Sequence, residues 1–209
     1  MRPEIHYVNA QRRRGDAVAA DYVPISFFAG PCIERAGELL GKLLIRETDD
    51  GLMGGIIVET EAYLAENDPA CHSPARWGGN TAVGSPMAGT LYVYTIHGHC
   101  CLNIITAREQ ETGCILVRAI EPTHGIARMA ARRPKRRTEQ LARGPGNLCR
   151  ALAVTRAHSG RRLGEAPLYV LETRCAAPVV VATGRVGVSQ AADRRLRFLV
   201  KDSPFVSRG

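Results

Sequence analysis

An alternation of apolar and polar side chains marks residues Ile56–Tyr63 as a strand. The stretch reads Ile-Ile-Val-Glu-Thr-Glu-Ala-Tyr, three β-branched residues followed by alternation. A period of two places Glu59, Glu61 and Tyr63 on one face. Taken alone, this pattern favours an edge strand whose charged face lies in water, because carboxylates are seldom buried. The alternative is a general base beside an aromatic stacking surface, and the pattern leaves both open.

Other parts of the chain carry helical or strand periodicity. Apolar residues at helical spacing predict a helix from Cys32, with Pro31 in its first turn and Gly41 at its end. Further helical patterns follow residues 121–122 and 144–147. Apolar or alternating runs predict strands at residues 42–47, 53–63, 90–96, 100–106, 114–120, 168–172, 179–182, 185–189 and 197–200.

Turn signals join these strands into antiparallel units. Asp49-Asp50-Gly51 and His97-Gly98-His99 each lie between two strands, which predicts two hairpins. Strands in blocks, with helices between the blocks, predict one α+β domain around a mainly antiparallel sheet. We place this domain at residues 23–209 and interpret the basic segment 1–22 as a flexible tail. Residues 64–89 form a long Gly- and Pro-rich segment, a kind that is usually functional or disordered.

Charge narrows the class of partner. The 28 Lys and Arg exceed the 20 Asp and Glu, which gives 28 − 20 = +8 at pH 7. This balance suits a polyanion, with DNA or RNA first and an anionic membrane surface second. The basic run at residues 132–137 is either a phosphate-contacting patch or an ordinary solvated surface.

The seven cysteines bear on the cellular compartment. Their odd count and irregular spacing, with no leader before them, predict a reduced, cytosolic protein. No apolar run is long enough to cross a bilayer, so we expect a soluble chain without a membrane partner.

Five polar or aromatic residues on the predicted strands supply the groups of a nucleobase pocket. Glu61 and Arg118 could hold a water, because a carboxylate beside an arginine stays ionised even when it is buried. Asn103 could give directional hydrogen bonds, and the rings of Tyr63 and Tyr94 could stack on a flat heterocycle. The alternative is a structural Glu–Arg pair beside core tyrosines.

A metal site is the other chemical candidate. Its ligands would come from Cys71-His72 together with His97, His99 and Cys100-Cys101. Cys100 and Cys101 are adjacent on a predicted strand, so their side chains point to opposite faces. We therefore expect no metal. Glycine-rich dinucleotide and Walker motifs are absent from the sequence as well.

Several longer blocks occur in the order of one known family. Together they resemble the alkyladenine (3-methyladenine) DNA glycosylase family from about Glu38 to Ser207. The resemblance implies a curved, mainly antiparallel sheet flanked by helices, with a β-hairpin wedge. The blocks are 58–63, 71–73, 89–94, 102–104, 116–122, 144–145 with 148–149, 185–188 and 203–204.

The resemblance implies specific roles in base excision. Glu61 would be the general base that activates the hydrolytic water, and Arg118 would help to hold that water. The three lysines lie outside the matched pocket blocks, so no Schiff-base lyase step is expected. The implied enzyme is a monofunctional hydrolase that releases alkylated purines, leaves an abasic site and needs no cofactor.

The resemblance also assigns residues to the flipped base and to the duplex. Base flipping costs a few kcal/mol, roughly, and a wedge offsets the vacancy left behind. The implied substrate is double-stranded DNA with damaged purines, bound by a monomer in the cytoplasm of a bacterial-type cell, on nucleoid DNA. Tyr63 and Tyr94 would stack on the base, His72 would contact its edge, Asn103 would form the pocket wall, His97 would be the wedge, and Gly187 would contact phosphate.

Departures from the family pattern affect the predicted grip on DNA. His97 replaces the usual tyrosine wedge, in a hairpin that is one residue shorter. Asn147 stands where a lysine is common, and residues 80–83 and 160–162 also differ from the family pattern. The alternative function is therefore a catalytically weak nucleic-acid-binding member of the same fold.

Overall fold

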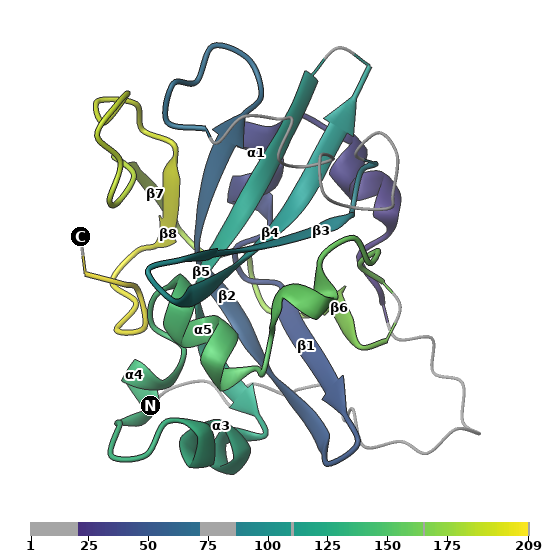
Figure 1. Cartoon of the computed structure of the whole chain (residues 1–209), viewed down its shortest axis with the longest axis vertical. Coiled ribbons are helices and arrows are strands. Elements are labelled where there is room, and N and C mark those ends of the chain that lie inside the picture. The colour runs from purple at the N-terminus through teal and green to yellow at the C-terminus, as the bar shows by residue number, and fades with distance from the viewer. Residues whose placement is uncertain (1–20, 72–86, 110, 165, 209) are drawn as a thin grey trace.

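An antiparallel sheet runs through the protein (Figure 1), and the buried charged residues Glu59, Glu61 and Arg118 lie on its strands. The computed structural model describes residues 21–71, 87–109, 111–164 and 166–208. The predicted tail lies outside these ranges except for its last two residues. The part of the long loop from His72 to Pro86 lies outside them too.

Eight strands make up this sheet in the described residues, and every pairing between them is antiparallel. The main path runs β3-β4-β5-β2-β1-β6, while β7 pairs with β8 and β8 pairs with β2. The α+β class and both predicted hairpins are thereby confirmed. The strands are β1 (Leu43–Thr48), β2 (Gly51–Leu64), β3 (Leu91–Ile96), β4 (His99–Arg108), β5 (Glu111–His124), β6 (Leu168–Leu171), β7 (Val180–Thr183) and β8 (Arg197–Val200).

Strand β2 lies inside the sheet along its whole length. It pairs with β5 on one side and, on the other, first with β1 and then with β8 at Glu59–Glu61. The edge-strand interpretation of this stretch is therefore wrong. A register irregularity on either side of Glu59 also breaks the strict alternation, and Val58–Ala62 are all buried.

Short helices cover the sheet and supply much of the core. The helix α1 begins at Cys32 as predicted, with Pro31 just before its first turn, and it ends at Glu38, before Gly41 with its positive φ of 86°. In Figure 1, α3, α4 and α5 gather at one end of the sheet, and α5 lies next to the β3–β4 hairpin. The helices are η1 (Ile25–Ala29), α1 (Cys32–Glu38), α3 (Ile126–Arg132), α4 (Thr138–Leu141), α5 (Pro145–Ala151) and η2 (Arg156–His158).

The strand predicted at residues 185–189 is wrong, because the segment is irregular. The backbone N–H of Val186 donates to a side chain, Glu61, instead of to a neighbouring strand. Gly187 then has φ +74°, a left-handed conformation that interrupts extended backbone. The segment lies between β7 and β8 in the chain and contacts Glu61 on β2 through Val186.

Candidate active site

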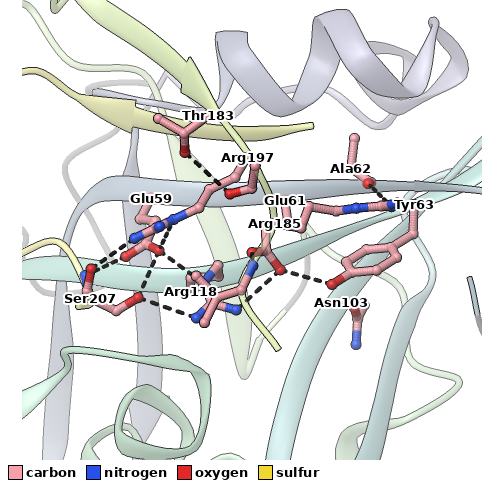
Figure 2. Close-up of polar contacts among 12 residues, drawn as sticks. Glu59, Glu61, Ala62, Tyr63, Asn103, Arg118, Thr183, Arg185, Arg197 and Ser207 are labelled. Atoms are coloured by element: carbon pink, nitrogen blue, oxygen red, sulfur yellow. Dashed lines mark hydrogen bonds and ion pairs between the residues drawn. The ribbon is translucent and has the colours of Figure 1, made fainter. Parts of the chain in front are cut away.

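Glu61 lies at the centre of a cluster of buried polar groups on β2 (Figure 2). One carboxylate oxygen, Oε2, accepts from Tyr63 Oη at 2.8 Å and from Arg118 Nη1 at 3.1 Å. The other, Oε1, accepts from the backbone N–H of Val186 at 2.8 Å. All three partners donate to the carboxylate. A carboxylate has about four acceptor directions, and hydrogen bonds from the described residues use three of them.

Arg118 reaches Glu61 from the neighbouring strand, β5. Its Nε donates to Glu59 Oε1 at 2.8 Å, its Nη1 to Glu61, and its Nη2 to Ser207 Oγ at 3.2 Å. Burial lowers the pKa of Arg118, but the charges of Glu61 and Glu59 outweigh that effect, so the pKa lies above its usual value. Arg118 is therefore a permanent cation shared between two carboxylates.

Glu59 anchors a second arginine and the segment after β8. Its Oε1 accepts from Arg197 Nε at 2.8 Å and from Ser207 Oγ at 2.7 Å, and its Oε2 accepts from Ser207 N at 2.5 Å. Glu59 is fully buried, as is Glu61. Every contact of Glu59 lies within the fold, which agrees with a structural role for this strand residue.

A cavity of about 460 Å³ opens next to the Glu61 cluster. Glu61 is itself fully covered, but all three residues that hydrogen-bond to it line the cavity wall. The carboxylate therefore lies directly behind that wall. The lining residues are Tyr63, Pro69, Ala70, Cys71, Tyr92, Tyr94, Ile96, His97, Cys101, Asn103, Cys114, Leu116, Arg118, Pro145, Val186, Gly187, Val188, Ser189 and Gln190.

Tyr63 is fixed both through its hydroxyl and over its ring. The Arg185 guanidinium lies 4.6 Å from the ring centroid, a cation–π contact. Arg185 in turn forms a bidentate ion pair with Asp68, from Nη1 to Oδ2 at 2.6 Å and from Nη2 to Oδ1 at 2.7 Å. Its Nη1 also donates to the carbonyl of Ala62. Burial, and then the charge of Glu61, raise the pKa of Tyr63, so the phenol keeps its proton and acts as a donor.

The opposite part of the wall comes from the β3–β4 hairpin. Tyr92 and Tyr94 stack on each other with ring centroids 5.4 Å apart. Asn103 donates from Nδ2 to the carbonyls of Tyr92 and Cys101, at 3.1 and 3.3 Å. Both amide protons are thereby used, and the amide orientation is fixed.

Three thiols line the same cavity, and none suits nucleophilic catalysis. Burial raises the pKa of Cys71 to about 12, and it raises the pKa of Cys101 and of Cys114 as well. A thiol with a raised pKa carries little thiolate near pH 7. None of the three thiols is therefore suited to act as a nucleophile in this cavity.

His97 and Gly187 contribute exposed edges of the cavity. His97 occupies the two-residue turn between β3 and β4, with φ +48°, and its side chain is exposed. A Cβ atom added to Gly187 would meet nothing within 4 Å, so the backbone of Gly187 is open to an incoming group. Both residues line the cavity and are exposed at its edge.

The structure brings most of the predicted site residues together. Glu61 lies behind the wall of the cavity described above, and His72 lies outside the described residues. The predicted residues that line this cavity are Tyr63, Tyr94, His97, Asn103, Arg118 and Gly187.

Sequence reasoning missed Arg185, Asp68, Arg197 and Ser207 as members of the network. A signal did exist: buried carboxylates need cationic partners. Two glutamates inside one apolar strand therefore call for more than one arginine, and Arg185 and Arg197 both belong to short apolar segments.

Two other possibilities can be examined in the part of the chain that is described. There, no three His, Cys, Asp or Glu side chains are placed to share a metal ion. Cys101 faces the cavity, whereas Cys100 packs against the main core. No helix among the described residues has the length and apolar character needed to span a bilayer.

Comparisons with known proteins give one consistent result. Residues 26–204 match the family model described as methylpurine-DNA glycosylase. A Bacillus subtilis protein that bears the name of a 3-methyladenine DNA glycosylase is 40% identical over 191 residues, which cover 89% of this chain and 96% of that protein. A protein of the same name from Methanocella arvoryzae is 39% identical, with coverage of 89% and 96%. One from Rhodopseudomonas palustris strain BisB18 is 42% identical, with coverage of 88% and 89%.

Proposed function

Because the chain belongs to the methylpurine-DNA glycosylase family, we propose that it is a monofunctional glycosylase of base-excision repair. It flips an alkylated purine of the 3-methyladenine class out of duplex DNA and hydrolyses its N-glycosidic bond. The products are the free base and an abasic site. It acts as a monomer, in the cytoplasm, on nucleoid DNA that contains damaged purines.

The proposed reaction is a substitution at C1′ of the damaged nucleotide. A water oxygen bonds to C1′ while the bond from C1′ to the purine nitrogen breaks. The bonding electron pair leaves with the base, which neutralises the charge that alkylation gave it. The water proton passes to Glu61 and from there to solvent. The leaving group is already activated, so the protein supplies mainly a positioned water and a base.

The observation that carries this proposal is the position of Glu61 between donors and cavity. Its carboxylate is held by Tyr63, Arg118 and Val186, and all three line the cavity that would receive the base. The remaining acceptor direction on the carboxylate suits a water. Arg118, which touches the same carboxylate, would hold that water from the side of β5.

The aromatic wall supports a flipped purine as the occupant. Tyr63 and Tyr94 supply ring faces, and a cationic alkylpurine stacks well on such faces. The ring of Tyr63 is already oriented by Arg185. His97 would fill the gap in the duplex, and the open backbone at Gly187 would approach a phosphate.

The positions of the lysines support hydrolysis without a lyase step. All three lysines of the chain, Lys42, Lys135 and Lys201, lie in described residues, and none of them lines the cavity. Lys42 is paired with Glu172 at 2.7 Å. A Schiff base needs an amine at C1′, and no lysine is placed to supply one.

The exposed His97 favours the alternative of a catalytically weak nucleic-acid-binding protein, since imidazole is smaller than the wedge tyrosine of the family.

The test is to incubate the protein with alkylated duplex and with oligonucleotides that contain ethenoadenine or hypoxanthine. We expect free 3-methyladenine and a strand that stays intact until alkali is added. Strand cleavage without alkali would refute the monofunctional assignment. No base release from any substrate, with duplex binding intact in wild type and Glu61→Gln alike, would favour the alternative.

A further inference from the structure

Ser207 forms a bridge between the two charged partners at the base of the site. Its Oγ donates to Glu59 Oε1 at 2.7 Å and accepts from Arg118 Nη2 at 3.2 Å (Figure 2). The Ser207 side chain touches neither the cavity nor Glu61. We infer that Ser207, together with Glu59, is a positioning residue for Arg118, an inference that rests on the function proposed above.

Three contacts in three directions fix the Arg118 guanidinium. Nε is held by Glu59, Nη2 by Ser207, and Nη1 is thereby aimed at Glu61. Each nitrogen of this planar guanidinium therefore has a partner in a different direction. The Ser207 hydroxyl supplies one of the three contacts that set the direction in which Arg118 meets the proposed general base and its water.

The charges of the cluster explain why a neutral residue suits this place. Glu59 and Glu61 are balanced by Arg118 and Arg197, two anions against two cations in a buried region. A charged group in place of Ser207 would leave one charge unbalanced, which is costly when buried. Without the serine hydroxyl, Arg118 keeps its contacts with Glu59 and Glu61 and loses the one at Nη2. With one contact fewer, the guanidinium is less precisely directed at Glu61.

The segment that carries Ser207 stays in place through its main chain. Ser207 N donates to Glu59, the carbonyl of Ser207 accepts from Arg197 Nη2 at 2.7 Å, and the carbonyl of Val206 accepts from Arg143 Nε. None of these bonds involves the hydroxyl. Ser207→Ala should therefore remove the contact with Arg118 while the segment remains docked.

The chain provides a matched control in Ser203. Its hydroxyl accepts from Phe205 N in the same segment, and no hydrogen bond from it reaches Arg118. Under single turnover with saturating alkylated duplex, we expect Ser207→Ala to slow base release about tenfold, because small misplacements of catalytic groups are costly. Ser203→Ala should change the rate less than twofold. Duplex affinity should be similar in both variants, whereas Tm should fall more in Ser207→Ala, because Arg118 Nη2 loses a buried partner.

A second measurement on the DNA-free protein separates this inference from the proposed function. In ¹⁵N spectra, hindered rotation of the Arg118 guanidinium should give separate Nη signals, assigned by their loss in Arg118→Lys. These signals should merge in Ser207→Ala and stay separate in Ser203→Ala. Unchanged signals in Ser207→Ala would overturn the positioning role, as would equal release rates in the two serine variants. A wild-type protein that releases no base would instead refute the proposed function, and the spectra would still decide whether Ser207 holds Arg118.

Discussion

The hydroxyl of Tyr63 donates to Glu61 at 2.8 Å, so one side chain connects the cavity wall to the carboxylate behind it. Tyr63 lines the cavity, and its phenol donates to the proposed general base. Under the proposed function, stacking of the base and alignment of the carboxylate would be coupled through this single residue on β2.

Tyr63→Phe should separate these two effects. The ring remains, so affinity for damaged duplex should stay within about twofold. The lost hydrogen bond to a charged group should slow base release about ten- to hundredfold, consistent with about 1.5 to 3 kcal/mol for such a contact. Single-turnover rates and binding isotherms measure both quantities. Tyr94→Phe is the comparison, because its hydroxyl lies beside Cys101 and not Glu61; a larger loss of rate in Tyr94→Phe would contradict the coupling.

His97 at the hairpin turn provides a test of base flipping. His97→Ala should slow release from stable base pairs, roughly tenfold, because an unfilled gap makes extrusion costlier. His97→Tyr should raise the rate above wild type, since the larger ring fills the gap better. His99→Ala is the control: His99 is equally exposed but packs on Gly146 of α5 and does not line the cavity. An unchanged rate in His97→Ala would remove the wedge role.

The basic run after α3 provides a test of how the duplex is held. Arg136 and Arg137 are exposed, and neither forms an ion pair with an acidic side chain among the described residues. If they contact phosphate, Arg136→Ala with Arg137→Ala should weaken binding equally for all sequences. The slope of log K against log salt should fall by about 1 to 2.

Arg174→Ala serves as the control for this charge effect. Arg174 is exposed and follows β6, at the edge of the sheet opposite β3. Its removal should leave the salt slope near that of wild type. Equal slopes for the wild type and the double variant would assign the run to ordinary solvated surface.

The buried pair of Arg185 and Asp68 should make stability depend on acid pH. Burial raises the pKa of Asp68, but hydrogen bonds from Arg185, Leu64 and Ala70 and the Arg185 charge outweigh it, so the pKa lies below its usual value. A lowered folded pKa means stabilisation that is present above the unfolded pKa of about 4 and lost as pH falls through the folded pKa.

Urea unfolding of wild type and Asp68→Asn measures this dependence. At pH 7, Asp68→Asn should be less stable by about 3 to 5 kcal/mol, because Arg185 remains buried without its carboxylate. Between pH 5 and pH 3 the wild type should lose more stability than the variant, so the two curves converge. Parallel curves would show that the pair contributes no pH dependence.

Local patterns were sufficient for most elements of this fold. The alternation in β2 and the apolar runs of β3, β4 and β5 predicted strands that the structure confirms, and turn residues predicted the hairpins. The strand prediction for residues 185–189 failed although their apolar pattern is typical of a strand. The positive φ of Gly187 and the hydrogen bond from Val186 N to Glu61 prevent a regular strand there. The burial of both glutamates could not be foreseen either, since it depends on β8 and Ser207, more than 130 residues away in sequence.

The central claim is that Glu61 is the general base, and Glu61→Gln tests it most directly. The amide keeps the size of the side chain but cannot take up a proton. We predict that single-turnover release of 3-methyladenine from saturating alkylated duplex falls by about 10² to 10⁴-fold, while the affinity for that duplex stays within about threefold of wild type. Release by Glu61→Gln at a rate within threefold of wild type would contradict the account.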